Sequence, residues 1–161
     1  VDNLMLTLGD IFKYTENTDV LLQFRDRVLI IIRNFNNYQF NSYNQDEVDQ
    51  MTDLLEGLIY LSGSVFQAFC SDEQFISNRE NIEILFSFRI ILRTSLFPHK
   101  KIGYSLLLFL NSVLQNRAAA RSVNIYLNHI NIKNQLKYFS EHDDENLSKK
   151  SRNMLNRLLN A

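Results

Sequence analysis

The sequence predicts an all-α fold of stacked antiparallel helices. Apolar residues recur every three or four positions along most of the 161 residues, which is the period of an amphipathic helix. One proline and four glycines leave few of the residues that interrupt helices. The apolar share of 45%, with twelve phenylalanines, is typical of a domain that buries a core. A chain of this length is expected to form one domain, residues 1–161.

Two helices are expected before residue 36. The first ends at the polar run KYTENTD, residues 13–19. The second is expected to start at Thr18 or Asp19, whose side-chain oxygens can accept hydrogen bonds from free backbone amides. Its run VLIII, residues 28–32, could alone form a strand, but the flanking residues keep the helical period. The apolar positions of the two helices are Leu4, Leu8, Ile11, Phe12, Leu21, Phe24, Val28, Ile31, Ile32 and Phe35.

Residues 36–45, NNYQFNSYNQ, predict an Asn-rich loop. Asn and Ser side chains compete locally for backbone hydrogen bonds, so these residues disfavour a helix. The aromatic residues Tyr38, Phe40 and Tyr43 are candidate anchors for a partner, or they fold back onto the core. Alternation of amides with aromatics also fits a prion-like composition, although the stretch is short.

Three further helices are expected between Asp46 and Asn116. The first runs to Phe69, with a kink or break near residues 62–64, because glycine weakens a helix. The run SNRE, residues 77–80, has the form of a capping box and predicts a helix over 78–95. Pro98 is expected in the first turn of the next, where its missing amide costs nothing.

One or two short helices over 123–139 and a final helix bring the expected total to seven or eight. Two of these helices, 78–95 and 98–116, are apolar on nearly every side, as in elements packed between neighbours. This pattern favours stacked layers over a simple four-helix bundle.

The acidic run His142, Asp143, Asp144 and Glu145 raises the question of a metal or proton-transfer site. Consecutive residues of a helix point about 100° apart, so these side chains do not converge on one ion. Acids at the positive end of a helix dipole, with basic residues further along, instead indicate a helix N-terminus. We therefore expect no metal, cofactor or catalytic residue in this run, and no known catalytic motif occurs elsewhere.

Charge and cysteine content restrict the partners and the setting. The net charge of about −1 gives no long-range field that would attract nucleic acid or an anionic membrane. No apolar run approaches the ~20 residues that cross a bilayer, so no membrane partner is expected. Cys70 is the only cysteine, which excludes an internal disulfide and suits an intracellular setting, cytoplasmic or nuclear. The chain opens on Val and closes within a helical pattern, so it is expected to be an excerpt of a longer protein.

The final helix predicts a polar, basic surface around one apolar stripe. Leu147, Met154, Leu155 and Leu158 form the stripe. The remaining positions are a solvated face or a binding surface for an acidic partner or phosphates, aided by two lysines one helix earlier. The candidate residues are Lys149, Lys150, Arg152, Asn153, Asn156, Arg157, Lys133 and Lys137.

Residues 132–161 resemble the second and third helices of an armadillo or HEAT-like repeat. In that family pattern an apolar helix is followed by a small polar residue, an acidic turn and a third helix of form apolar-x3-small-x3-Leu-x2-Leu. The matching residues are Leu136, Phe139, Ser140, Asp143, Asp144, Leu147, Ser151, Leu155 and Leu158. A weaker echo, Ile102, Leu106, Leu110 and Val113, lies about 45 residues upstream, close to the period of such repeats.

The resemblance implies a superhelical array of helices that binds other proteins. Armadillo repeats that bind extended peptides carry Trp and Asn on the third helix. Asn153 and Arg157 fall at those places here, and the sequence has no Trp, so it departs from that peptide-binding pattern. The function expected first is thus a non-enzymatic scaffold that binds a partner segment, typically an amphipathic helix, or another subunit. Self-association is a further expectation. The alternatives are a nucleic-acid-binding helical module that uses the basic final helix and, last, an enzyme whose site is assembled from distant residues.

Overall fold

A computed structural model describes residues 2–36, 45–92 and 98–160 of the chain. All regular secondary structure in this described part is helical, so the all-α prediction is confirmed. The predicted total of seven or eight helices is wrong, because the described residues form eleven. These are α1 (Asp2–Tyr14), α2 (Thr18–Asn36), α3 (Gln45–Phe69), α4 (Glu73–Ser77), α5 (Arg79–Leu85), α6 (Phe88–Ile91), α7 (Lys100–Gln115), α8 (Arg117–Ser122), α9 (Asn124–Leu127), α10 (Ile130–Ser140) and α11 (Glu145–Leu159).

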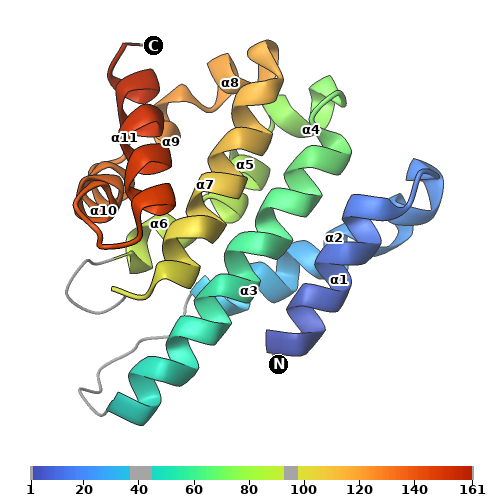
Figure 1. Ribbon diagram of the computed structural model, residues 1–161. Coiled ribbons are helices and arrows are strands. Elements are labelled where there is room, and N and C mark those ends of the chain that lie inside the picture. The colour runs from blue at the N-terminus through green and yellow to red at the C-terminus, as the bar shows by residue number, and fades with distance from the viewer. Residues whose placement is uncertain (1, 37–44, 93–97, 161) are drawn as a thin grey trace.

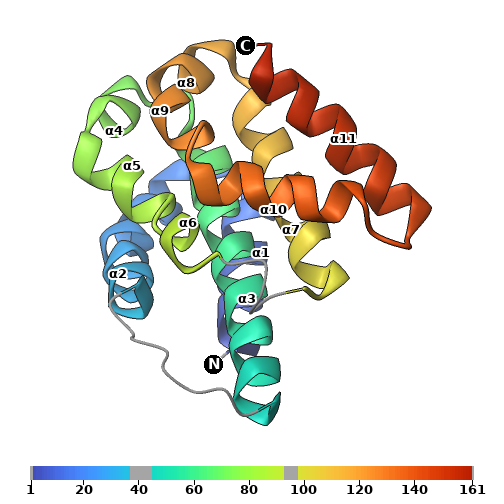
Figure 2. The ribbon, with the colours of Figure 1, turned by 90° about the vertical axis from the view of Figure 1, so that its left-hand side faces the viewer.

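The helices lie in two layers. Figure 1 shows α1, α3, α7 and α11 side by side in the nearer layer, α2 and α5 behind them, and α10 beside α11 at one edge. Figure 2, turned by 90°, shows α2, α5 and α6 on one side of α3 and α7, α10 crossing in front of α3 and α7, and α4, α8 and α9 gathered at one end. We call the outer side of the first layer, which faces the viewer in Figure 1, the front face.

Neighbouring helices of the first layer run in the same direction. Near the start of α3 and α7, Lys101 Nζ lies 3.4 Å from Asp53 Oδ1. Near the start of α7 and α11, the Tyr104 hydroxyl donates to Asp144 Oδ1 at 3.0 Å. Towards the end of α7 and α11, Arg157 donates to Asn111 at 3.3 Å. The contacts between α7 and α11 advance along both helices together, so these two are parallel, and Figure 1 shows α1 and α3 running in the same direction.

An aromatic cluster joins the two layers. Phe86, between α5 and α6, packs edge-on against Phe109 of α7 with ring centroids 4.9 Å apart. Its centroid also lies 6.3 Å from that of Phe66 in α3 and 5.4 Å from that of Tyr126 in α9. All four residues belong to one continuous buried core. The cluster fixes α3, α7 and the short helices of the second layer against one another.

The helix starts differ from the predicted ones. The Asn17 side chain, rather than Thr18 or Asp19, accepts the amide hydrogen bond at the start of α2. The Asn78 side chain accepts from the amides of residues 80 and 81, so the predicted capping box at Ser77 is wrong. α7 starts at Lys100, capped by His99, and not at the proline before it. A short Asn or His side chain competes well for these amides, because it reaches an amide two residues ahead.

The predicted helix over 78–95 is interrupted after Leu85. The backbone of Phe86 leaves the helical region, with φ −99° and ψ 3°, and α6 begins at Phe88. The turn places both phenylalanine rings in the aromatic cluster. The apolar period of this segment favours one continuous helix. The helix nevertheless breaks at the residue where the two phenylalanine rings pack into the core.

The expected break near residues 62–64 is absent, because α3 is continuous from Gln45 to Phe69. Gly63 lies where α3 meets α7: a Cβ atom there would be 3.2 Å from Phe109 Cδ2. The glycine therefore permits close approach of two helices and does not interrupt one. The small loss of helix preference is offset by packing.

The apolar stripes expected for α1 and α2 are only partly buried. Leu4 is 55% exposed and Phe24 is 48% exposed, whereas Met5 and Leu21 are buried. α1 is the outermost helix of its layer in Figure 1, so only one of its sides is covered by α3. Position in the stack, not the apolar period, decides which residues become core here.

Candidate protein-interaction surface

The acidic run forms the N-terminus of α11, as the sequence predicts. Asp144 is the N-cap residue: its Oδ1 accepts hydrogen bonds from the Leu147 amide at 3.1 Å and from the Tyr104 hydroxyl at 3.0 Å. These two hydrogen bonds lower the pKa of the Asp144 carboxyl. Within the described residues, no group of three His, Cys, Asp or Glu side chains is placed to hold a metal ion.

All three histidines of the sequence accept a backbone hydrogen bond at the start of a helix or in the turn before it. The Nδ1 atoms of His99, His129 and His142 each accept from the amide two residues ahead, at 3.1, 3.3 and 3.0 Å. Burial, with a smaller contribution from the nearby Arg89, lowers the pKa of His129, which favours the neutral ring that can accept. The imidazoles thus have structural roles that a sequence pattern did not reveal.

α11 presents its basic residues to solvent. Leu147, Met154 and Leu158 are buried, so the predicted apolar stripe is confirmed, with Leu155 half-buried beside it. The exposed residues of the helix include Lys149, Lys150, Arg152, Asn153, Asn156 and Arg157. Their role in binding remains a prediction. On α10, Lys137 is exposed and Lys133 is half-buried.

A groove separates α7 from α11 on the front face. Its volume is about 220 Å³. α7 contributes four residues spaced i, i+3, i+4 and i+7, and α11 contributes four with the same spacing. The lining residues are Tyr104, Leu107, Leu108, Asn111, Lys150, Asn153, Met154 and Arg157. Since this spacing follows one face of each helix, the groove runs along both helix axes.

A broader hollow of about 560 Å³ lies on the other side of α11. It is lined by His142, Glu145, Ser148, Lys149, Arg152, Asn153 and Asn156. Asn153 lines both the groove and this hollow. Lys133 and Lys137 line neither. The predicted anchors Tyr38, Phe40 and Tyr43 lie outside the described residues.

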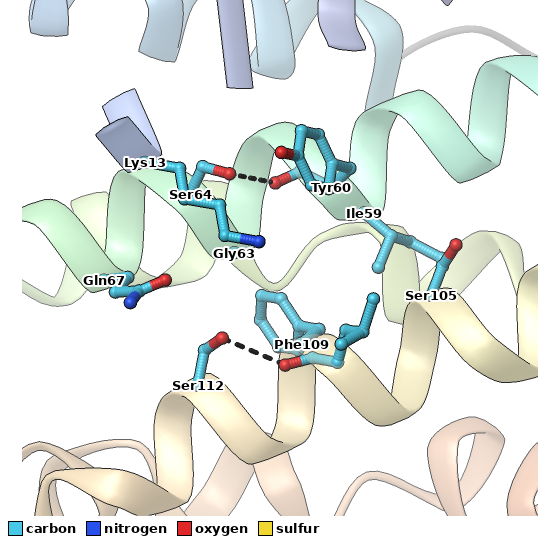
Figure 3. Close-up of a pocket in the computed structure, with 10 residues that line it drawn as sticks. Lys13, Ile59, Tyr60, Gly63, Ser64, Gln67, Ser105, Phe109 and Ser112 are labelled. Atoms are coloured by element: carbon cyan, nitrogen blue, oxygen red, sulfur yellow. Dashed lines mark hydrogen bonds between the residues drawn. The ribbon is translucent and has the colours of Figure 1, made fainter. Parts of the chain in front are cut away.

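A second, smaller groove of about 50 Å³ lies between α3 and α7 (Figure 3). Lys13 of α1, Tyr60 and Gln67 of α3, and Ser112 of α7 are among its lining residues. Leu108, which is 58% exposed, lines this groove and the α7–α11 groove. The two grooves therefore lie next to each other on the front face, with Leu108 between them.

The Tyr60 hydroxyl donates a hydrogen bond to the Asp10 carboxylate and joins α3 to α1. Burial, followed by the hydrogen bond and the negative charge of Asp10, raises the pKa of Tyr60 to about 12. Because the folded-state pKa is raised, this group stabilises the fold fully below the unfolded value of 10. The contribution is lost as the pH rises through about 12.

We expect Tyr60 to ionise later than an ordinary tyrosine. Subtracting the alkaline absorbance titration of Tyr60→Phe from that of the wild type should give a midpoint near 12. Asp10→Asn should lower this midpoint, because it removes the negative charge beside the phenol. A difference titration centred at 10 in the folded protein, or one unmoved by Asp10→Asn, would contradict the assignment.

The cations that line the α11 surface have no acidic partner in the part of the chain that the structure describes. In the described part of the chain, no carboxylate lies within 4.0 Å of the charged groups of Lys149, Lys150, Arg152 or Arg157. Arg152 instead donates to Ser148, and Arg157 to Asn111. Other cations are paired across helices: Arg25 with Asp72, Arg33 with Glu80, Arg89 with Glu83, and Lys101 with Asp53. The positive charge of α11 is thus available to a ligand.

Sequence reasoning missed the α7 side of the groove. The run GYSLLLFLNSVL indicated a helix that is apolar on nearly every side and hence buried, yet Leu108 is exposed. The apolar residues around the whole of this helix were the available signal, because a helix that is covered on one side only must expose some of them. Which residues are exposed depends on the neighbouring helices, and the sequence does not show those.

The sequence matches no protein-family model, and no curated protein or solved structure is significantly similar to the chain. None of the described helices combines the length and the apolar character needed to cross a bilayer.

Proposed function

We propose that this protein is a non-enzymatic protein-interaction scaffold, built as an armadillo- or HEAT-like stack of helices, that binds a partner segment on its front face. The observation that carries the proposal is the groove between α7 and α11, which combines an exposed leucine with cations that no carboxylate of the described chain neutralises. Exposed apolar patches rimmed by polar residues are typical of surfaces that bind proteins. In this groove Leu108 is the exposed apolar residue, and Lys150 and Arg157 are the charged residues near it.

A recurring sequence separation supports the repeat architecture. Arg25 pairs with Asp72 and Arg33 with Glu80, 47 residues apart in both cases. The contact between Lys101 and Asp53 spans 48 residues. The contacts from Asn116 to the Cys70 carbonyl and from Arg157 to Asn111 each span 46. Other side-chain contacts between helices span 40, 42 and 50 residues. Stacked helical repeats give separations near one period, and armadillo and HEAT repeats have periods of about 40–47 residues.

The apolar pattern of α7, which resembles that of α11 about 45 residues later, supports the same arrangement. Ile102 and Leu106 of α7 are buried, as are Leu147 and Ser151 at the corresponding places of α11. The two helices are parallel neighbours, which is the relation expected of equivalent helices in successive repeats. The single free cysteine, Cys70, fits the intracellular setting that we propose for the scaffold.

A site-specific photo-crosslinker tests the proposal. We expect a crosslinker at Leu108, which is 58% exposed on the front face, to capture a discrete partner in cells. At Ile90, which is 59% exposed on α6 in the second layer, the same crosslinker is the matched control and should capture little. Equal capture at both positions, or none at Leu108, would refute a front-face binding site. A crosslinked product of two copies of the chain would identify the partner as self.

Nucleic-acid binding is the second candidate, because the four cations of α11 lack acidic partners among the described residues. It requires affinity that falls steeply with added salt, as phosphate contacts release counterions. Two observations favour a protein partner instead. The net charge is about −1, and leucine and methionine side chains line the groove.

A further inference from the structure

We propose that the groove between α7 and α11 binds an acidic amphipathic helix of a partner protein. This inference rests on the proposed scaffold function and adds the site and the chemistry of its ligand. The groove lies between two parallel helices, each of which lines it with residues at i, i+3, i+4 and i+7. From i to i+7 a helix rises about 10.5 Å, or two turns.

The groove has an apolar centre and cationic residues towards its ends. Leu108, which is 58% exposed, is the accessible apolar side chain at the centre, and the buried Leu107 and Met154 also line it. Lys150 lies one turn before Met154 along α11, and Arg157 lies three residues after it. A ligand that follows the groove therefore meets positive charge, then apolar side chains, then positive charge.

A ligand helix that lies along the groove can place acidic, apolar and acidic side chains opposite the cationic, apolar and cationic parts of the groove. Carboxylates at i and i+7 of the ligand have the same separation as Lys150 and Arg157, and apolar residues at i+3 and i+4 fall over the centre. An extended segment matches less well: successive side chains point to opposite faces, and those on one face are separated by multiples of about 6.7 Å.

Charge decides between an acidic and a basic or neutral ligand. Neither Lys150 nor Arg157 has a carboxylate within ion-pair distance in the described chain. Arg157 is held by the neutral side chain of Asn111, which leaves its charge uncompensated. Acidic groups on the ligand would neutralise both cations, and like charges would be repelled.

A nucleic-acid backbone fits the same surface poorly. Only two cations line the groove, and the next turn towards the start of α11 carries Asp144 and Glu145. A duplex presents one phosphate charge per about 1.7 Å, so it would extend over these carboxylates. Apolar side chains at the centre of the groove also form no hydrogen bond or ion pair with a phosphate.

The test uses a designed probe and the whole chain. The probe is a fluorescent, alanine-rich helical peptide of about 20 residues, long enough to hold helical structure, with glutamates at i and i+7 and leucines at i+3 and i+4. We expect saturable binding by fluorescence anisotropy. Replacing the glutamates with lysines, or the leucines with glutamines, should weaken binding at least tenfold.

Charge reversals on the two sides of α11 provide matched variants. Lys150→Glu with Arg157→Glu should raise the Kd for the peptide at least tenfold, because both ends of the groove then repel it. Lys149→Glu with Arg152→Glu changes the same helix by the same charge but faces the other hollow, and should leave the Kd within about twofold. Circular dichroism of each variant confirms that the helices are retained.

Three results would overturn the inference. The first is no binding of the peptide, and the second is equal weakening by the two double variants. The third is tighter binding of a fluorescent oligothymidine than of the peptide, lost in Lys150→Glu with Arg157→Glu, which would assign the groove to nucleic acid. If the crosslinker at Leu108 still captures a protein while the peptide fails, the acidic-helix inference falls and the scaffold proposal stands. Failure of the crosslinker itself removes the scaffold proposal.

Discussion

Phe86→Ala is expected to lower the free energy of unfolding by about 3–5 kcal/mol, the usual cost of truncating a buried phenylalanine. Phe86 is fully buried and contacts rings from three other parts of the fold. Truncation leaves a cavity between the layers, because the neighbouring rings belong to separate helices and cannot all move inward. Urea unfolding followed by circular dichroism measures the loss.

Two further variants make the Phe86 result specific. Phe86→Leu should cost less than Phe86→Ala, because most of the cavity remains filled. Ile125→Ala removes an apolar side chain that is 72% exposed and should change stability by no more than about 0.5 kcal/mol. If Phe86→Ala cost no more than Ile125→Ala, the aromatic cluster would not hold the layers together.

Gly103→Val is expected to destabilise the protein by about 2 kcal/mol, within the range for overpacked cores. A Cβ atom at this position would lie 2.9 Å from Leu147 Cδ1 in α11 and 3.1 Å from Phe139 Cδ1 in α10. Both neighbours are fully buried, so neither side chain has free space into which to move. The gain from replacing a helical glycine is at most about 1 kcal/mol and does not offset the overlap.

A double-mutant cycle separates steric overlap from other effects of Gly103→Val. Leu147→Ala removes the two Cδ atoms that the new side chain would meet. Gly103→Val with Leu147→Ala should therefore lose less stability than the sum of the two single variants, by at least about 0.5 kcal/mol. Additive losses in thermal or urea unfolding would show that the contact between α7 and α11 is not the cause.

Local rules predicted the helical character well and the helix boundaries less well. The VLIII run lies in a helix, and the acidic run caps α11 through Asp144, because both outcomes depend on residues within one or two turns. The interruption at Phe86 was not predicted. It coincides with ring contacts to residues more than 20 positions away in the sequence, which no local pattern contains.

The candidate surface was predicted in part. The periodicity of α11 identified its exposed basic positions, since a helix with one buried stripe must expose the rest. It did not divide them into two groups. Lys150 and Arg157 face α7, whereas Lys149 and Arg152 face the other hollow, and this division exists only because α7 lies on one side of α11.

The sequence by itself determined that this protein is all-helical, where its last helix begins and which side of that helix is buried, because each depends on residues a few positions apart. Only the tertiary structure decided that α7 and α11 lie parallel with a groove between them, and that Leu108 of α7 lies on the exposed side of its helix. The physical reason is that burial depends on which helix becomes the neighbour. That choice is made by contacts such as Gly103 with Leu147 and Asn111 with Arg157, between residues some 45 positions apart.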